Sequence, residues 1–124
     1  MKVLKISYPT SLSEISNKEN DNIDVFVELE DGYSITVVVS TPLNLLDQMN
    51  RDNINFIAPP QPEIIVKSLT EENIALAIEE YAREDAFWLK LLYVASLDKD
   101  AIDLGRIHRY LFEIQRMNNE LTGE

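Results

Sequence analysis

The sequence lacks cysteine altogether and has only one histidine and three glycines among its 124 residues. The absence of cysteine excludes disulfides, iron–sulfur clusters, thiolate zinc sites and a cysteine nucleophile. A single histidine excludes a multi-histidine metal site within one chain. No glycine-rich phosphate loop is present, and no serine lies in a Gly-x-Ser-x-Gly pattern. The sequence therefore predicts no cofactor and no metal.

The chain also lacks long apolar runs and an excess of basic residues. Eleven Lys and Arg stand against 22 Asp and Glu, and this net charge of −11 opposes binding to nucleic-acid phosphate. No apolar run approaches the roughly 20 residues that span a membrane. The first residues are too charged for a signal-peptide core. We expect a cytoplasmic protein that binds neither nucleic acid nor a membrane.

Two segments of alternating apolar and polar residues, 23–30 and 33–40, predict neighbouring strands with one apolar face each. An Asp-Gly pair between them is typical of a two-residue hairpin loop. That register would place apolar side chains opposite polar ones. We therefore predict a three-residue loop, in which Val27 pairs with Ile35 and Gly32 has a positive φ.

Capping residues and short apolar runs predict the elements that follow. Thr41 before Pro42 indicates the start of a short helix that ends near residue 50. Apolar runs at 54–58 and 64–66 predict short strands. The proline-containing connector at 59–62 is extended, and either a stiff linker or a docking segment fits it.

The second half of the chain is predicted to be helical. Thr70 caps a long helix over 71–95, and a last helix starts near Asp98 or Asp100. The last helix has apolar residues at heptad-like spacing, namely Leu104, Ile107, Leu111 and Ile114. The order of elements predicts a single α+β domain over residues 1–124. In it, a small antiparallel sheet is covered on one face by the long helix and the C-terminal helix.

Asp85 is the most unusual residue of the long helix, because it lies in the middle of the apolar face. An unpaired carboxylate costs free energy in apolar surroundings, so we expect Asp85 to be buried with a hydrogen-bond partner or beside a pocket. The predicted ligand pocket contains Tyr81, Asp85 and Trp88 of the long helix together with His108 of the last helix. One alternative is a satisfied core carboxylate beside a packed or solvated histidine. Another is a bend in the helix that places Asp85 at the rim of the apolar face.

Two further surfaces could bind proteins. Acidic residues of the long helix predict binding to a basic partner, unless they only form a solvated face: Glu71, Glu72, Glu79, Glu80 and Glu84. A second apolar stripe contains Phe87, Leu91 and Val94 and faces away from the expected sheet. It predicts self-association unless the last helix covers it.

These features favour a non-enzymatic, acidic interaction protein of the immunity or antitoxin type, which binds a basic protein partner. The absence of a catalytic motif and the net charge of −11 support this interpretation. One alternative is a small-molecule-binding protein or hydrolase with its pocket around Asp85. Another is a self-associating structural subunit such as a homodimer. The sequence leaves all three open.

Overall fold

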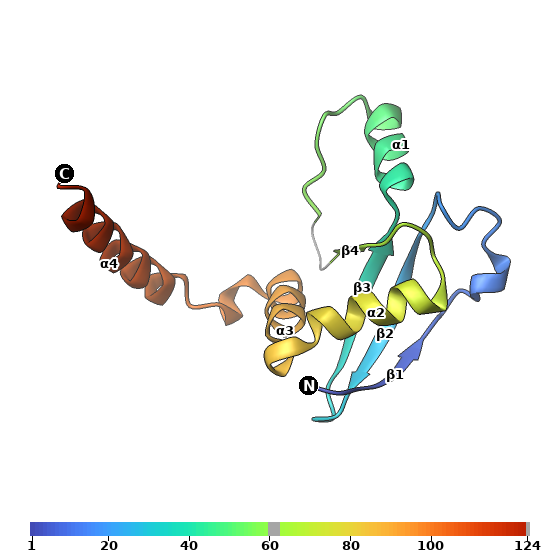
Figure 1. The fold of residues 1–124 in the computed structure, drawn as a ribbon, viewed down its shortest axis with the longest axis horizontal. Helices are drawn as coiled ribbons and strands as arrows, with labels where there is room; N and C mark the ends of the chain where they lie inside the picture. Colours follow the sequence, from blue (N-terminus) through green and yellow to red (C-terminus); the bar gives the residue numbers. More distant parts are fainter. Residues whose placement is uncertain (60–62, 124) are drawn as a thin grey trace.

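A computed structural model of the chain describes residues 1–59 and 63–123. The described part has an N-terminal half made mainly of strands and a C-terminal half made of helices (Figure 1). In chain order, the elements are β1 (Val3–Ser7), η1 (Leu12–Glu14), β2 (Asn22–Leu29), β3 (Ser34–Ser40), α1 (Pro42–Asp52), β4 (Glu63–Ile65), α2 (Glu71–Tyr81), α3 (Arg83–Leu97), η2 (Lys99–Ala101) and α4 (Leu104–Thr122). The predicted α+β class is confirmed.

The β2–β3 hairpin has the register that the apolar pattern predicts. Val27 pairs with Ile35, and Gly32 has a φ of 91°. The Leu29 backbone N–H donates to the Tyr33 carbonyl at 2.9 Å, and the Gly32 N–H donates to the Leu29 carbonyl at 3.0 Å. Burial of one face therefore decides the register against the Asp-Gly turn signal.

The sheet has the strand order β1-β2-β3-β4, so β1 and β4 lie at its edges. β1 and β3 are antiparallel to β2, whereas β4 is parallel to β3. The prediction of a purely antiparallel sheet is thus wrong at β4. The reason is the connection: a parallel pair needs a crossover, and the chain between β3 and β4 contains α1 (Figure 1).

Helix α1 begins as its sequence predicts. Thr41 Oγ1 accepts a hydrogen bond from the Asn44 backbone N–H at 3.4 Å, and Pro42 occupies the first helical position. The strand predicted at 54–58 is wrong, because these residues form no strand and β4 occupies the edge of β3. Residues 60–62 of the proline-containing connector lie outside the described residues.

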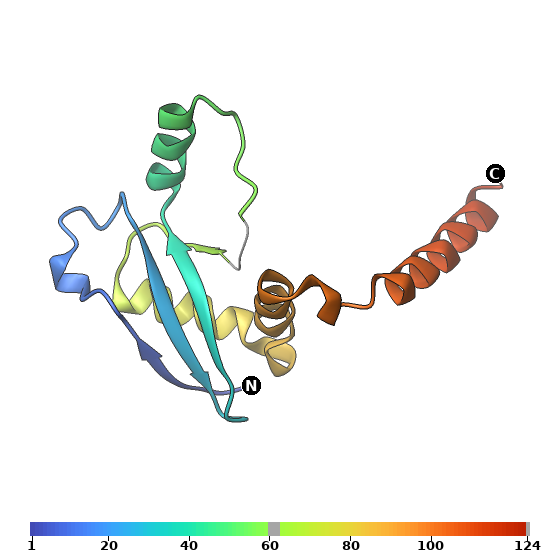
Figure 2. The same cartoon turned by 180° about the vertical axis from the view of Figure 1, so that it is seen from behind.

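The core lies between one face of the sheet and helices α2 and α3. Figures 1 and 2 show α2 running across that face. The core side chains come from alternate positions of β2 and β3 and from the inner faces of the helices: Ile23, Val25, Val27, Leu29, Ile35, Val37, Val39, Ile74, Ile78 and Leu89. The residues that alternate with them in β2 are exposed, as in sheets with one solvated face.

The single helix predicted over 71–95 is wrong, because the chain breaks at Ala82 into α2 and α3. Glu84, Asp85 and Ala86 have φ values of 53°, 61° and 56°, in the left-handed region. This turn places Ala82 and Ala86 in the core, where both are fully buried. A straight helix would instead bring a carboxylate toward the sheet, which costs free energy without a partner.

Helix α4 does not pack on the sheet, and that prediction is also wrong. Ile114 is its only described residue that is not exposed, and Figures 1 and 2 show α4 extending away from the other elements. The helix starts later than predicted: the Asp103 side chain accepts from the Arg106 N–H at 3.0 Å, while Asp98 caps η2. These two consecutive caps lead the chain away from α3.

Candidate functional site

The four residues predicted to form a ligand pocket are not brought together. Asp85 is exposed, so the expectation of its burial is wrong. Tyr81 and Trp88 expose 39% and 55% of their surfaces, and His108 is exposed on α4. Of these four residues, only Asp85 lines the shallow hollow on the outer side of α3.

The exposure of Asp85 follows from the left-handed turn between α2 and α3. In one straight helix, Asp85 would lie on the same face as Ile78, which is fully buried. The turn changes the phase of the helix, so that Leu89 enters the core and Asp85 stays in solvent. No sequence signal announces such a turn, because non-glycine residues rarely adopt a positive φ.

The five glutamates predicted to bind a partner are all exposed, but they do not form one surface. Glu71 and Glu79 line a groove beside β1. Glu80 pairs with Arg83 at 3.2 Å. Glu72 and Glu84 do not line that groove, so the acidic residues divide into a pair inside the groove and others outside it.

The groove lies between edge strand β1 and helix α2 and has a volume of about 330 Å³. Its lining is partly apolar and partly charged: Val3, Leu4, Lys5, Ile6, Tyr8, Glu71, Ala75 and Glu79. Glu71, Ala75 and Glu79 are spaced by four residues and so share one side of α2. Leu4 exposes 54% of its surface. The groove is open to solvent along an uncovered strand.

Burial, and after it the nearby Glu71 carboxylate, raise the pKa of the Tyr8 hydroxyl, which lines the strand side of the groove. On that side, β1 pairs with β2 and with no other described strand. The backbone N–H and C=O groups on the outer side of β1 are therefore outside the sheet ladder. The groove combines two features: a strand edge that can pair and a pair of carboxylates opposite it.

Sequence analysis missed this groove. The eight-residue separation of Glu71 and Glu79, two steps of four residues through Ala75, was the available signal, because it places both carboxylates on one side of a helix. The element opposite them, β1, comes from the other end of the chain. Local patterns do not reveal which helix side lies beside which strand.

The predicted self-association stripe is open, as that prediction requires. Phe87, Leu91 and Val94 line a hollow of about 430 Å³, together with Ile102. Phe87 exposes 52% of its surface and meets the Trp88 ring edge to face, with ring centroids 5.3 Å apart. Helix α4, whose packing over the stripe was the alternative to self-association, lies elsewhere (Figure 1).

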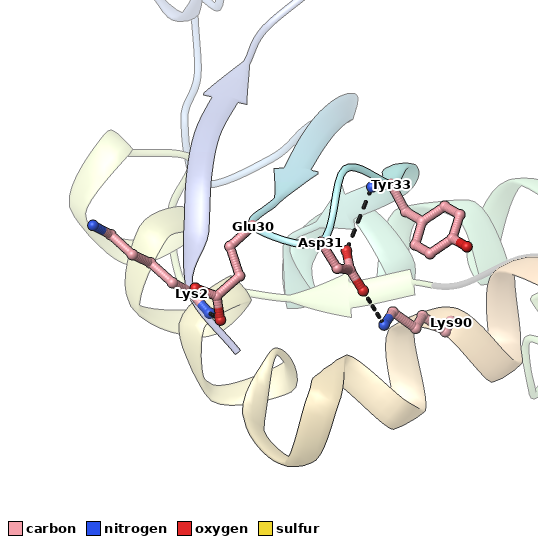
Figure 3. A network of polar contacts seen from close by, with 5 residues as sticks. All are labelled: Lys2, Glu30, Asp31, Tyr33 and Lys90. Carbon is pink, nitrogen blue, oxygen red and sulfur yellow. Dashed lines mark hydrogen bonds and ion pairs between the residues drawn. The ribbon is translucent and has the colours of Figure 1, made fainter.

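A polar network fixes α3 to the hairpin loop, as Figure 3 shows. The Lys90 ammonium donates to the Asp31 carboxylate and lies 5.7 Å from the centre of the Tyr33 ring. The hydrogen bond from Lys90 is the main reason that the pKa of Asp31 is below its ordinary value. In the same region, the Lys2 backbone N–H donates to Glu30 at 3.0 Å. These contacts are structural and lie outside the groove.

In the two described ranges, no group of three or more His, Cys, Asp and Glu side chains is arranged to hold a metal ion. None of the helices in the described part of the chain is long and apolar enough to cross a membrane. Comparisons with protein-family models, with curated proteins and with solved structures give no match to this chain. The functional proposal therefore depends on the residues themselves.

Proposed function

We propose that this protein is a non-enzymatic interaction protein, and that its groove between β1 and α2 binds an extended basic segment of a protein partner. The observation that carries this proposal is the position of Glu71 and Glu79 along the open edge of β1. An immunity or antitoxin protein would occlude a basic partner in this way.

The open edge of β1 supports an extended ligand. A peptide strand that enters the groove can pair with the free backbone groups of β1 and so add a strand to the sheet. The register of β1 shifts between Val3 and Lys5, and such irregularities limit indiscriminate edge pairing. A short partner segment with matching side chains fits this edge better than a long regular strand.

The charges of the groove support a basic ligand. Glu71 and Glu79 contribute two carboxylates, and Lys5 contributes one ammonium group. The surrounding chain adds to this field, since the whole protein has a net charge of −11. Lysine or arginine side chains of the ligand would be attracted over a distance and then paired locally. The exposed Leu4 offers an apolar contact for the residues between them.

A peptide titration tests the proposal. The probe is a synthetic peptide of alternating lysine and valine, added to isotope-labelled protein and followed through the backbone amide signals. We expect the largest shifts in β1 and on the side of α2 that contains Ala75. The double variant Glu71→Gln with Glu79→Gln should weaken binding about tenfold or more, because each carboxylate pairs with one lysine.

Two controls separate the groove from general attraction. The double variant Glu72→Gln with Glu84→Gln removes the same charge outside the groove and should bind almost as tightly as the parent protein. A peptide methylated at alternate backbone nitrogens keeps its charge but cannot pair with β1, and it should bind poorly. Equal weakening by both double variants, or unchanged binding of the methylated peptide, would refute binding in the groove.

Self-association is a second candidate function, favoured by the open stripe of Phe87, Leu91 and Val94. A ligand pocket around Asp85 has no comparable support, because the residues predicted to form it lie apart. The stripe lies on a different surface from the groove.

A further inference from the structure

Helix α4 is amphipathic although it contacts no sheet. At 100° per residue, its apolar side chains gather on one side, which we call the α4 seam: Leu104, Ile107, Tyr110, Leu111, Ile114, Met117 and Leu121. Most of this seam is exposed, with Leu121 at 85%. A 19-residue helix is about 28 Å long, so the seam is a long apolar strip in water.

The outer side of α3 presents a surface of the same kind. Its hollow of about 430 Å³ is lined by the Phe87, Leu91 and Val94 stripe with Ile102. Three charged residues complete the lining, namely Glu84, Asp85 and Lys90, and the Lys90 ammonium is paired with Asp31. Helices pack at axis separations of 8–10 Å when apolar ridges enter apolar grooves. The α3 hollow is therefore a suitable surface for the α4 seam.

The connection between α3 and α4 directs α4 away from the α3 of its own chain. It is ordered by backbone hydrogen bonds, from the Ala101 N–H to the Asp98 carbonyl at 3.2 Å and from the Ile102 N–H to the Lys99 carbonyl at 3.2 Å. The cap at Asp103 then fixes the first turn of α4. Short, ordered connections of this kind favour exchange of the following element between two copies.

The net charge of α4 is opposite in sign to that of the rest of the chain. Residues 104–122 contain three arginines and two glutamates, a net charge of +1, whereas residues 1–103 contain eight basic and 19 acidic residues, a net charge of −11. Of the α4 arginines, Arg106 flanks the seam and can approach the carboxylates that line the α3 hollow of another copy. Arg109 and Arg116 lie on the far side of α4 and contribute only to its net charge. Attraction between a basic arm and an acidic body favours this encounter.

We propose that two copies of this chain form a symmetric dimer by exchanging α4, with the α4 seam of each copy packed in the α3 hollow of the other. Each copy then buries both its α4 seam and its α3 hollow. Burial of two apolar surfaces per copy brings the interface toward the roughly 800 Å² per partner of stable complexes. A coiled coil of two α4 helices is less suitable, because Asn118 interrupts a seam of fewer than three heptads.

Adjacent residues of α4 provide a matched mutational test in sedimentation experiments. Leu111→Glu places a charge in the seam and should raise the dissociation constant of the dimer at least about tenfold. Phe112→Glu makes the same change on the next residue, which exposes 71% of its surface and lies off the seam, and should leave the dimer intact. A monomeric parent protein at high concentration, or equal effects of both variants, overturns the proposal.

Cysteine cross-linking tests the contact between α4 of one copy and α3 of the other. Because the chain contains no cysteine, each introduced cysteine is the only thiol in its protein. Untagged Leu91→Cys protein is mixed with tagged Leu111→Cys protein and treated with a short bismaleimide. Exchange predicts abundant mixed dimers, and far fewer when Glu113→Cys on the opposite side of α4 replaces Leu111→Cys. Cross-links that close within one chain of the double variant, or Leu111 to Leu111 links alone, overturn the proposal. These results are independent of the groove variants.

Discussion

The left-handed turn at residues 84–86 predicts the sign of a stability difference. A non-glycine residue in this conformation costs about 1–2 kcal/mol, whereas glycine adopts it freely but loses about 0.5–1 kcal/mol more backbone entropy on folding. Glu84 has a φ of 53°. The Glu84→Gly variant should therefore be more stable than the Glu84→Ala variant by about 0.5–1 kcal/mol. Both variants remove the same exposed carboxylate, so its charge cancels in the comparison.

The free energy of unfolding is measured for both variants by urea denaturation followed by circular dichroism. Leu76, which is exposed in the middle of α2, provides the control pair. There, Leu76→Gly should be less stable than Leu76→Ala by about 1 kcal/mol, as in an ordinary helix. If Glu84→Gly were also the less stable of its pair, α2 and α3 would form one continuous helix and our account of Asp85 would be wrong.

Three further predictions concern the hairpin, the core and the polar network. Gly32→Ala should cost about 1 kcal/mol in thermal unfolding from backbone strain alone, because an added Cβ meets no atom within 4 Å; an unchanged midpoint would contradict the φ of 91°. Ile78→Ala should cost about 2–5 kcal/mol in urea, because Ile78 is fully buried, and a smaller loss would mean a looser core. Lys90→Met should lower stability at neutral pH. Because the pKa of Asp31 is lowered in the folded protein, the stability from the pair is present above the unfolded pKa of about 4 and is lost as pH falls through the folded pKa. The difference between parent and variant should therefore shrink in acid, and a difference that grows there would contradict this pairing.

The parts of the fold that the sequence predicts are those set by local physical chemistry. The hairpin register follows from period-two alternation and from the cost of turning apolar residues to solvent. The starts of α1 and α2 follow from threonine caps, and Thr70 Oγ1 indeed accepts from the Asn73 N–H at 3.2 Å. Ile64 in β4 is buried, as its apolar run indicates. Each of these features depends on residues close together in the chain.

The parts that could not be predicted depend on the arrangement of distant segments. The turn at Glu84 has no glycine to mark it, so the helical period appears continuous through it. The seam of α4 is visible in the sequence, but its pattern does not say whether the partner lies in the same chain. The groove needs β1 and α2 side by side, which no local pattern specifies. The four residues of the predicted pocket, Tyr81, Asp85, Trp88 and His108, were therefore placed together although the structure leaves all four exposed and apart.

The order of the elements along the chain has a consequence for synthesis. The central strands are complete at Ser40, but the side chains that cover their apolar face come from Ile74 onward. A growing chain is extended at about 5–20 residues per second, so the hairpin can pair several seconds before its cover exists. During that interval Val25 and Val37, which are fully enclosed in the finished protein, face water on the nascent chain. Any shortened product that ends before α2 would keep this apolar face uncovered. It would aggregate even if its β2–β3 hairpin formed.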